Sequence, residues 1–261
     1  MEIVANLSML FTELPLLERV RAASAAGFNA VEIQFPYDVP AIQLKEELQR
    51  CGMPLVLINL PAGDLMQGGH GIACDPQARA AFTDALDEAL SYALMVRPRL
   101  VNVLAGRLAA GASYGRAFAT LAANLREAAQ AFDRLGIRVV CEAINPLDMP
   151  GFLINTPEHL DKLLAEVRHD NCFAQLDVYH MARQGISTEQ ALAVLGDRVA
   201  HVQFADYPGR GEPGSGELDF VAMHDALKQA GYQGALAAEY RPSSSTTESL
   251  AWLQQPPFHQ P

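Results

Sequence analysis

Residues 138–177 read RVVCEAINPLDMPGFLINTPEHLDKLLAEVRHDNCFAQLD, and this stretch decides the fold. The short apolar runs at its two ends, Arg138–Glu142 and Phe173–Asp177, are typical of buried strands. Between them, Thr156 followed by Pro157 predicts the start of a helix, because threonine caps helices and proline fits their first turn. A strand, a helix and a second strand in this order predict parallel strands joined by a helical crossover.

The same alternation continues toward both ends of the chain. Eight segments are predicted as strands: Ile3–Asn6, Ala30–Ile33, Pro54–Asn59, Leu100–Val103, Arg138–Glu142, Phe173–Asp177, Val199–Gln203 and Gly234–Glu239. This count, within 261 residues, predicts a single-domain α/β protein, a (β/α)8 TIM barrel. We assign residues 1–253 to the barrel and residues 254–261 to a short C-terminal tail. An open, doubly wound sheet is the alternative, and the lack of a GxGxxG motif after the first strand disfavours its dinucleotide-binding form.

Several helix ends are marked in the sequence. Ser113 and Gly136 bound a stretch with one apolar stripe, which is typical of an amphipathic helix. Residues 187–190, STEQ, fit a capping box. Asp219 is expected to cap a further helix. These signals place helices in the crossovers between the predicted strands.

The charge and composition exclude several classes of function. The formal net charge of −11 disfavours nucleic acid as a partner and requires a local basic pocket for any anionic substrate. None of the four cysteines forms a CxxC pair, so we expect free thiols in a reducing compartment. The sequence shows neither a basic leader nor a long apolar run, so we expect a cytoplasmic protein that does not enter a membrane; a homo-oligomer remains open.

Polar side chains close four consecutive predicted strands: Glu142, Asp177, Gln203 and Glu239. In a barrel of this kind function lies at the carboxyl ends of the strands, where neighbouring strands are about 4.8 Å apart. Three carboxylates converging there would repel one another unless a cation lay between them. Oxygen ligands suit a hard cation, so we expect one divalent ion, Mg²⁺ or Mn²⁺, and no organic cofactor.

The loop sequences carry a family pattern. ANLSMLFTELP at the start, VEIQFPYD, NLPAGD and GIAC resemble the hydroxypyruvate isomerase family, and so do EAIN with MPGFLIN, QLDVYHM, HVQFAD with RGEPGSGEL, and the final AEYRP. The resemblance runs from the first strand to the eighth. It implies a xylose-isomerase-like barrel that converts hydroxypyruvate reversibly to tartronate semialdehyde (2-hydroxy-3-oxopropanoate). It also implies Glu142 and Glu239 as the catalytic acid and base, and Glu142, Asp177, Gln203 and Glu239 as the metal ligands. Arg241 departs from the pattern, since relatives often have lysine there.

An anionic hydroxy-oxo acid needs basic and hydrogen-bonding groups around it. The candidates for substrate binding are His180, Arg210, Asn59, His70 and Arg107, with Arg241 as a further basic residue. His201 either points into the barrel mouth or fills a layer of the barrel. The Gly- and Pro-rich loop 209–217 predicts a flexible cover over the site.

Other activities remain open on the same scaffold. A 2-oxo-tetronate isomerase, or another sugar or sugar-acid isomerase or epimerase, would keep the metal and the two glutamates. An inosose-dehydratase-like lyase would lose water instead of isomerising. A metallo-endonuclease fits poorly with seven histidines and a net charge of −11, and a non-catalytic binding module would not need both glutamates. The sequence does not separate proton transfer from a metal-mediated hydride shift.

Overall fold

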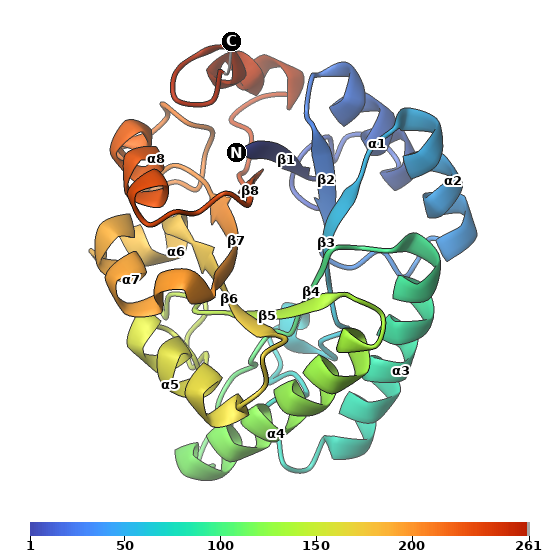
Figure 1. The fold of residues 1–261 in the computed structure, drawn as a ribbon, viewed down its shortest axis with the longest axis vertical. Helices are drawn as coiled ribbons and strands as arrows, with labels where there is room; N and C mark the ends of the chain where they lie inside the picture. The colour runs from blue at the N-terminus through green and yellow to red at the C-terminus, as the bar shows by residue number, and fades with distance from the viewer. Residues whose placement is uncertain (260–261) are drawn as a thin grey trace.

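Eight parallel strands close into a ring in the computed structural model, which describes residues 1–259 (Figure 1). The strands are β1 Glu2–Asn6, β2 Ala30–Ile33, β3 Leu55–Asn59, β4 Leu100–Asn102, β5 Arg138–Glu142, β6 Cys172–Asp177, β7 Val199–Phe204 and β8 Ala235–Ala238. Each strand pairs with the next along the chain, and β1 pairs with β8, where Val4 lies opposite Ala237. The predicted barrel is therefore confirmed, and the open sheet is excluded.

Helices surround the ring on the outside (Figure 1). They are α1 Leu16–Ala25, α2 Ala41–Cys51, α3 Arg79–Val96, α4 Tyr114–Asp133, α5 Pro157–Val167, α6 Val178–Ala182, α7 Thr188–Leu195 and α8 Phe220–Gln229, with short 3₁₀ segments η1 Leu65–Gln67, η2 Gly196–Arg198 and η3 Thr247–Gln254. None of these described helices is long and apolar enough to cross a membrane.

The predicted helix caps are present. The side chains of Ser113, Thr156 and Asp219 each accept a hydrogen bond from a backbone N–H in the first turn of α4, α5 and α8. Ser187 forms the complete capping box with Gln190 at the start of α7. The short helix α6 was not predicted; it follows β6 directly and is capped by Asp177. That cap fixes the backbone next to a predicted metal ligand.

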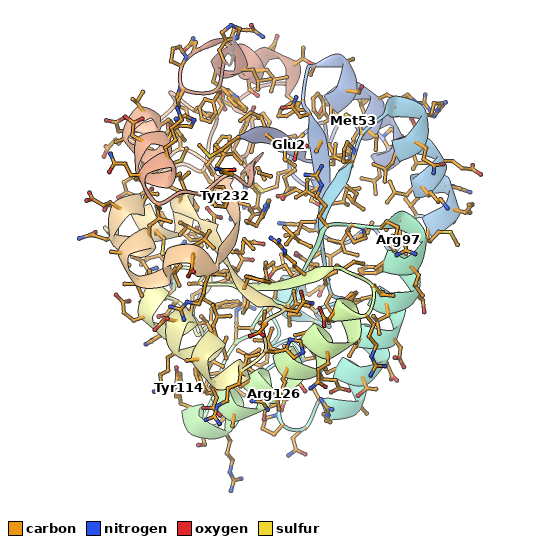
Figure 2. All side chains as sticks on the ribbon, in the orientation of Figure 1. Glu2, Met53, Arg97, Tyr114, Arg126 and Tyr232 are labelled. Carbon is orange, nitrogen blue, oxygen red and sulfur yellow. The ribbon has the colours of Figure 1, made fainter. Side chains whose placement is uncertain are left out.

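Side chains fill the centre of the ring, so the barrel is a packed core and not a pore (Figure 2). One apolar cluster comes from the strands alone and includes Val4, Val56 and Val140. A larger cluster lies between the strands and the helices. Part of the barrel interior is therefore apolar. The polar side chains of Glu142 and Asp177 lie at the carboxyl ends of their strands.

The predicted tail begins at residue 254, where η3 ends. Within its described part, the ring of Phe258 is 6% exposed and stacks on Phe204 at 4.9 Å between ring centroids. Trp252 contacts the same two rings. The chain thus packs against the barrel as far as residue 258, while residues 260–261 of the predicted tail lie outside the described residues.

Candidate active site

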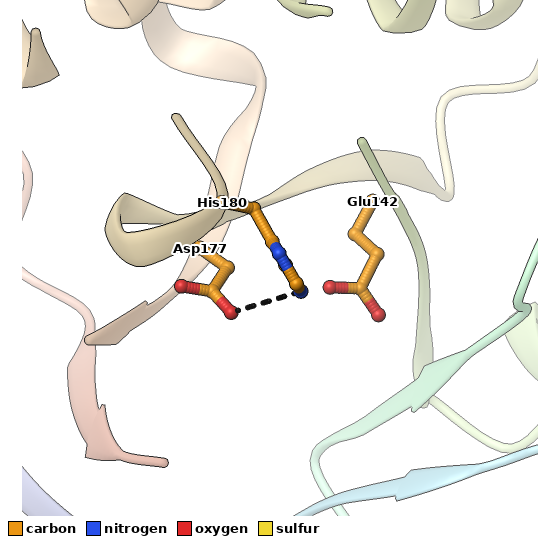
Figure 3. A group of neighbouring side chains, drawn as sticks. All are labelled: Glu142, Asp177 and His180. Atoms are coloured by element: carbon orange, nitrogen blue, oxygen red, sulfur yellow. Dashed lines mark ion pairs between the residues drawn. The ribbon is translucent and has the colours of Figure 1, made fainter. Parts of the chain in front are cut away.

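Three carboxylates meet at the carboxyl ends of the strands. Glu142 ends β5, Asp177 ends β6 and Glu239 follows β8 directly, and all three side chains are buried. His180, on α6, points toward the same place as Glu142 and Asp177 (Figure 3). One possible ligand atom from each of Glu142, Asp177 and His180 lies within 4.8 Å of the others. The strand ends therefore bring predicted site residues together from distant parts of the sequence.

Arg210 inserts its guanidinium between two of these carboxylates. Its Nη2 lies 3.3 Å from Asp177 Oδ2 and 3.2 Å from Glu239 Oε2. The same guanidinium covers the ring of Tyr179 at 5.0 Å. Since one positive charge faces three buried carboxylates, the cluster of described side chains has an excess of negative charge.

Burial makes this excess costly. It raises the pKa of Glu142 to about 7, with help from the negative charge of Asp177, although Asn102 and Arg210 act in the opposite direction. Burial also raises the pKa of Glu239 well above its usual range, against the attraction of Arg210. A further cation nearby would favour the charged form of both glutamates and so oppose these shifts. Burial lowers the pKa of the His180 imidazole to about 4, so that ring is neutral near pH 7.

The fourth predicted metal ligand, Gln203, lies beside Asp177 in the pairing of β6 with β7. Its Nε2 donates to Glu32 Oε1 at 2.7 Å, and its Oε1 accepts from Gln175 Nε2 at 2.6 Å. An amide oxygen has two lone pairs, so this oxygen can accept from Gln175 and still offer a lone pair to a cation. Of the predicted ligands, Glu142 and Asp177 belong to the group of described ligand atoms within 4.8 Å of one another, and Glu239 does not. Three carboxylates and one amide oxygen would be a donor set suited to Mg²⁺ or Mn²⁺.

A cavity of about 380 Å³ opens over the carboxylates. Three of the predicted substrate-binding residues line it, Asn59, His180 and Arg210, and so does Arg241. His70 and Arg107 are not among the described residues that line the cavity. Arg107 instead donates to the carbonyl oxygens of Leu65 and Gly69 at 3.1 and 2.8 Å, and its backbone N–H donates to the carbonyl of the exposed His70. The geometry thus gives these two residues a role in holding the loop after β3.

The sequence prediction missed two residues of this layer. Gln34 lines the cavity and donates from Nε2 to Glu239 Oε1 at 2.5 Å. Glu32 is fully buried and holds Gln203, Asn6 and the Nε2 atom of His201. His201 therefore fills a layer inside the barrel. The signal for both missed residues was present in the VEIQ segment, where charged and amide side chains interrupt an apolar run.

The loop 209–217, predicted as a flexible cover, lines the cavity with Gly209 and Arg210, and a buried side chain organises its backbone. Asp206 accepts hydrogen bonds from the backbone N–H groups of Tyr207 and Leu218 at Oδ1, and from those of Gly214 and Gly216 at Oδ2. Arg210 has a φ of +56° within this loop, and its carbonyl accepts from Arg241 N. The loop is thus built to deliver the Arg210 guanidinium to the carboxylates.

The chain is similar to known proteins over nearly its whole length. The hydroxypyruvate isomerase of Escherichia coli (strain K12) is 37% identical over 249 residues, which cover 95% of this chain and 96% of that protein. The 2-oxo-tetronate isomerase of Haemophilus influenzae is 36% identical over 251 residues, covering 96% and 97%. A crystal structure titled as a family 2 AP endonuclease from Brucella melitensis superposes with a TM-score of 0.92 at 35% identity, covering 97% of both chains. The family model described as xylose isomerase-like TIM barrel matches residues 20–255, and the chain belongs to that family.

Proposed function

We propose that this chain is a divalent-metal-dependent isomerase that interconverts hydroxypyruvate and tartronate semialdehyde. The observation that carries the proposal is the pair of buried glutamates, Glu142 and Glu239, which line one cavity from β5 and from the residue directly after β8. A carboxylate held within reach of a carbon acid can act as a general base, and its protonated form as a general acid. Two such groups, on β5 and just after β8, serve a reaction that moves a proton between adjacent carbons.

The chemistry balances within the substrate. One glutamate removes a proton from the hydroxymethyl carbon, C3, and the electrons form a C2–C3 double bond as the carbonyl oxygen on C2 gains negative charge. The other glutamate then delivers a proton to C2. The C3 hydroxyl passes its proton to the C2 oxygen, so that C3 becomes the aldehyde carbon and C2 carries the hydroxyl. No atom or electron is lost. A bound divalent cation supplies Lewis-acid stabilisation of the negative oxygen.

The residues around the carboxylates suit an anionic substrate. The cation would be held by the four predicted ligands, Glu142, Asp177, Gln203 and Glu239. Its charge would then take over part of the neutralisation of Asp177 and Glu239 that Arg210 provides. Arg210 becomes available for the carboxylate of the substrate, for which a guanidinium is the preferred partner. Asn59 and His180, which also line the cavity, would hydrogen-bond the remaining oxygens.

A 2-oxo-tetronate is the second candidate substrate. Relatives named for that activity and for hydroxypyruvate are almost equally similar to this chain, at 36% and 37% identity. Phe35, Met66 and Met149 add apolar side chains to the lining of the same cavity of about 380 Å³. Comparing kcat/KM for hydroxypyruvate and for 2-oxo-tetronate selects between them. A lyase would release water from its substrate, and product analysis distinguishes it.

The test of the proposal is turnover by metal-stripped protein in D₂O, followed by ¹H NMR, with Mg²⁺ or Mn²⁺ restored in turn. We expect conversion only with the metal, and deuterium at C2 of the product, which separates proton transfer from a hydride shift. Glu142→Gln and Glu239→Gln should each lower kcat by about 100-fold or more. Glu46→Gln, the same change on the exposed face of α2, is the control and should turn over normally. Full activity in either site variant would contradict the assignment.

A further inference from the structure

The side chains of Asn145 and His180 form a buried pair at the edge of the site. Asn145 is 0% exposed and His180 is 3% exposed, and Asn145 Nδ2 lies 2.7 Å from His180 Nδ1. A neutral imidazole has one nitrogen that donates and one that accepts, and its partner decides which is which. The orientation of the Asn145 amide therefore determines which nitrogen of His180 carries the proton.

Asp148 fixes that amide from two directions. The backbone N–H of Asp148 donates to Asn145 Oδ1 at 2.8 Å, and Asn145 Nδ2 donates to Asp148 Oδ2 at 3.1 Å. Reversing the amide would place its nitrogen against an N–H group and its oxygen against a carboxylate. Asp148 is held in turn by the hydroxyl of Tyr179, which donates to Oδ2 at 2.8 Å. Asn145 therefore presents an N–H, and not an oxygen, to His180.

The consequence at His180 follows directly. Nδ1 accepts from Asn145, so the ring proton is on Nε2, the nitrogen that faces the site 3.4 Å from Asp177 Oδ2. A nitrogen that carries a proton has no free lone pair and cannot bind a cation. Of the clustered residues Glu142, Asp177 and His180, the histidine is thus removed from the set of possible ligands.

We infer that Asn145 is a positioning residue that locks His180 as the Nε2–H tautomer, which keeps the ring off the cation and makes it a hydrogen-bond donor to a substrate oxygen. A neutral donor fixed in place stabilises an oxygen as it gains negative charge, without reorganising during the reaction. The tautomer itself does not depend on the proposed function, whereas the contact with a substrate oxygen rests on it.

The inference is tested by ¹⁵N NMR of metal-free protein labelled at histidine, near pH 7. The ring signals of His180 are identified by their loss in His180→Gln. We expect Nδ1 at the chemical shift of an unprotonated nitrogen and Nε2 at that of a protonated one. The tautomer is read from the wild-type protein, and His180→Gln serves only to assign its signals. The opposite assignment in the wild-type protein would overturn the inference.

Asn145→Asp is the matched perturbation, since it replaces the donating NH₂ with an accepting oxygen at almost constant volume. We expect the His180 proton to appear on Nδ1, where the new carboxylate accepts it. Asn155→Asp is the control: it makes the same change on the same loop, but its amide donates to Phe152 O and should leave the His180 signals unchanged. A wild-type pattern in Asn145→Asp would show that Asn145 does not select the tautomer.

Metal binding and turnover supply a second, independent readout. If His180 is not a ligand, His180→Gln should bind Mn²⁺ within about threefold of the wild-type affinity, while kcat/KM falls about tenfold or more. A fall in Mn²⁺ affinity of more than about tenfold would make His180 a ligand and overturn the inference. The ¹⁵N result needs no substrate, so a protein that shows the expected tautomer but does not convert hydroxypyruvate would fail the proposed function alone.

Discussion

Removal of the Arg210 charge is the perturbation that most directly probes the buried carboxylates. The guanidinium contacts Asp177 and Glu239 and lies over the Tyr179 ring, with 17% of its side chain exposed. Arg210→Met keeps an unbranched, apolar side chain at that position and removes the charge. In metal-free protein the variant leaves three buried carboxylates with no cation among them.

The size of the effect follows from the geometry. Breaking a buried ion pair by removing one partner typically costs about 3–5 kcal/mol. We expect the lower end, about 3 kcal/mol, because part of the guanidinium is exposed and the glutamates can take up protons. For a domain of this size about 1 kcal/mol corresponds to 2–4 °C, so the Tm of the metal-free variant should fall by about 6–12 °C.

The assay is thermal unfolding of wild-type and variant protein, first with a chelator and then with saturating Mn²⁺. The cation should substitute for the missing charge, so the Tm difference between the two proteins should shrink to about a third of its metal-free value. Arg241→Met is the control, because this residue lines the same cavity but is exposed and forms no ion pair in the described structure. Equal Tm values without metal, or a difference that Mn²⁺ leaves unchanged, would refute the reasoning.

Three further perturbations test other parts of the structure. Burial holds the pKa of Glu142 at about 7 instead of its ordinary 4.5. This group therefore favours folding below about pH 4.5, and that contribution is lost as the pH rises through 7. In metal-free protein, the free energy of unfolding of Glu142→Gln should gain about 3 kcal/mol relative to wild type between pH 4.5 and pH 8, measured by urea unfolding; a constant difference would contradict this. Asp206→Ala removes the acceptor of four backbone N–H groups in the loop that carries Arg210. Its kcat/KM should fall at least about tenfold, while its Mn²⁺ affinity should change little. Normal kinetics would argue against a role of this loop in positioning Arg210. Phe258→Ala should lower the free energy of unfolding by about 3 kcal/mol through lost packing on Trp252, while an unchanged value would mean that the segment after η3 does not contribute to the core.

The barrel was predictable because its signals are local and repeat eight times. Strands and crossover helices each carry their own periodicity and caps, and Thr156, Ser187 and Asp219 mark helix starts through short-range hydrogen bonds. Several strand ends shifted by one residue. For example, β8 is assigned only to Ala238 although Glu239 N still donates to Phe204 O. Such boundaries depend on partners in neighbouring strands, which a single segment does not specify.

The carboxylates were also predictable, because topology alone sends the ends of consecutive strands to one edge. Other parts of the site depend on contacts between distant segments. Arg210 reaches the carboxylates only because Asp206 folds the loop around it, and no local pattern encodes that path. Glu32 lies within a strand and not at its end, so a search of strand ends passes over it. The tautomer of His180 is set by Asn145, 35 positions away.

The central claim is that the buried carboxylates hold one divalent cation per chain. Isothermal titration of chelator-stripped protein with Mn²⁺ tests it without relying on any substrate. Wild-type protein should bind one ion per chain, and Asp177→Asn, which removes a charge but almost no volume, should lose at least about 100-fold in affinity. Failure of the wild-type protein to bind Mn²⁺, or equal affinity in Asp177→Asn, would contradict it.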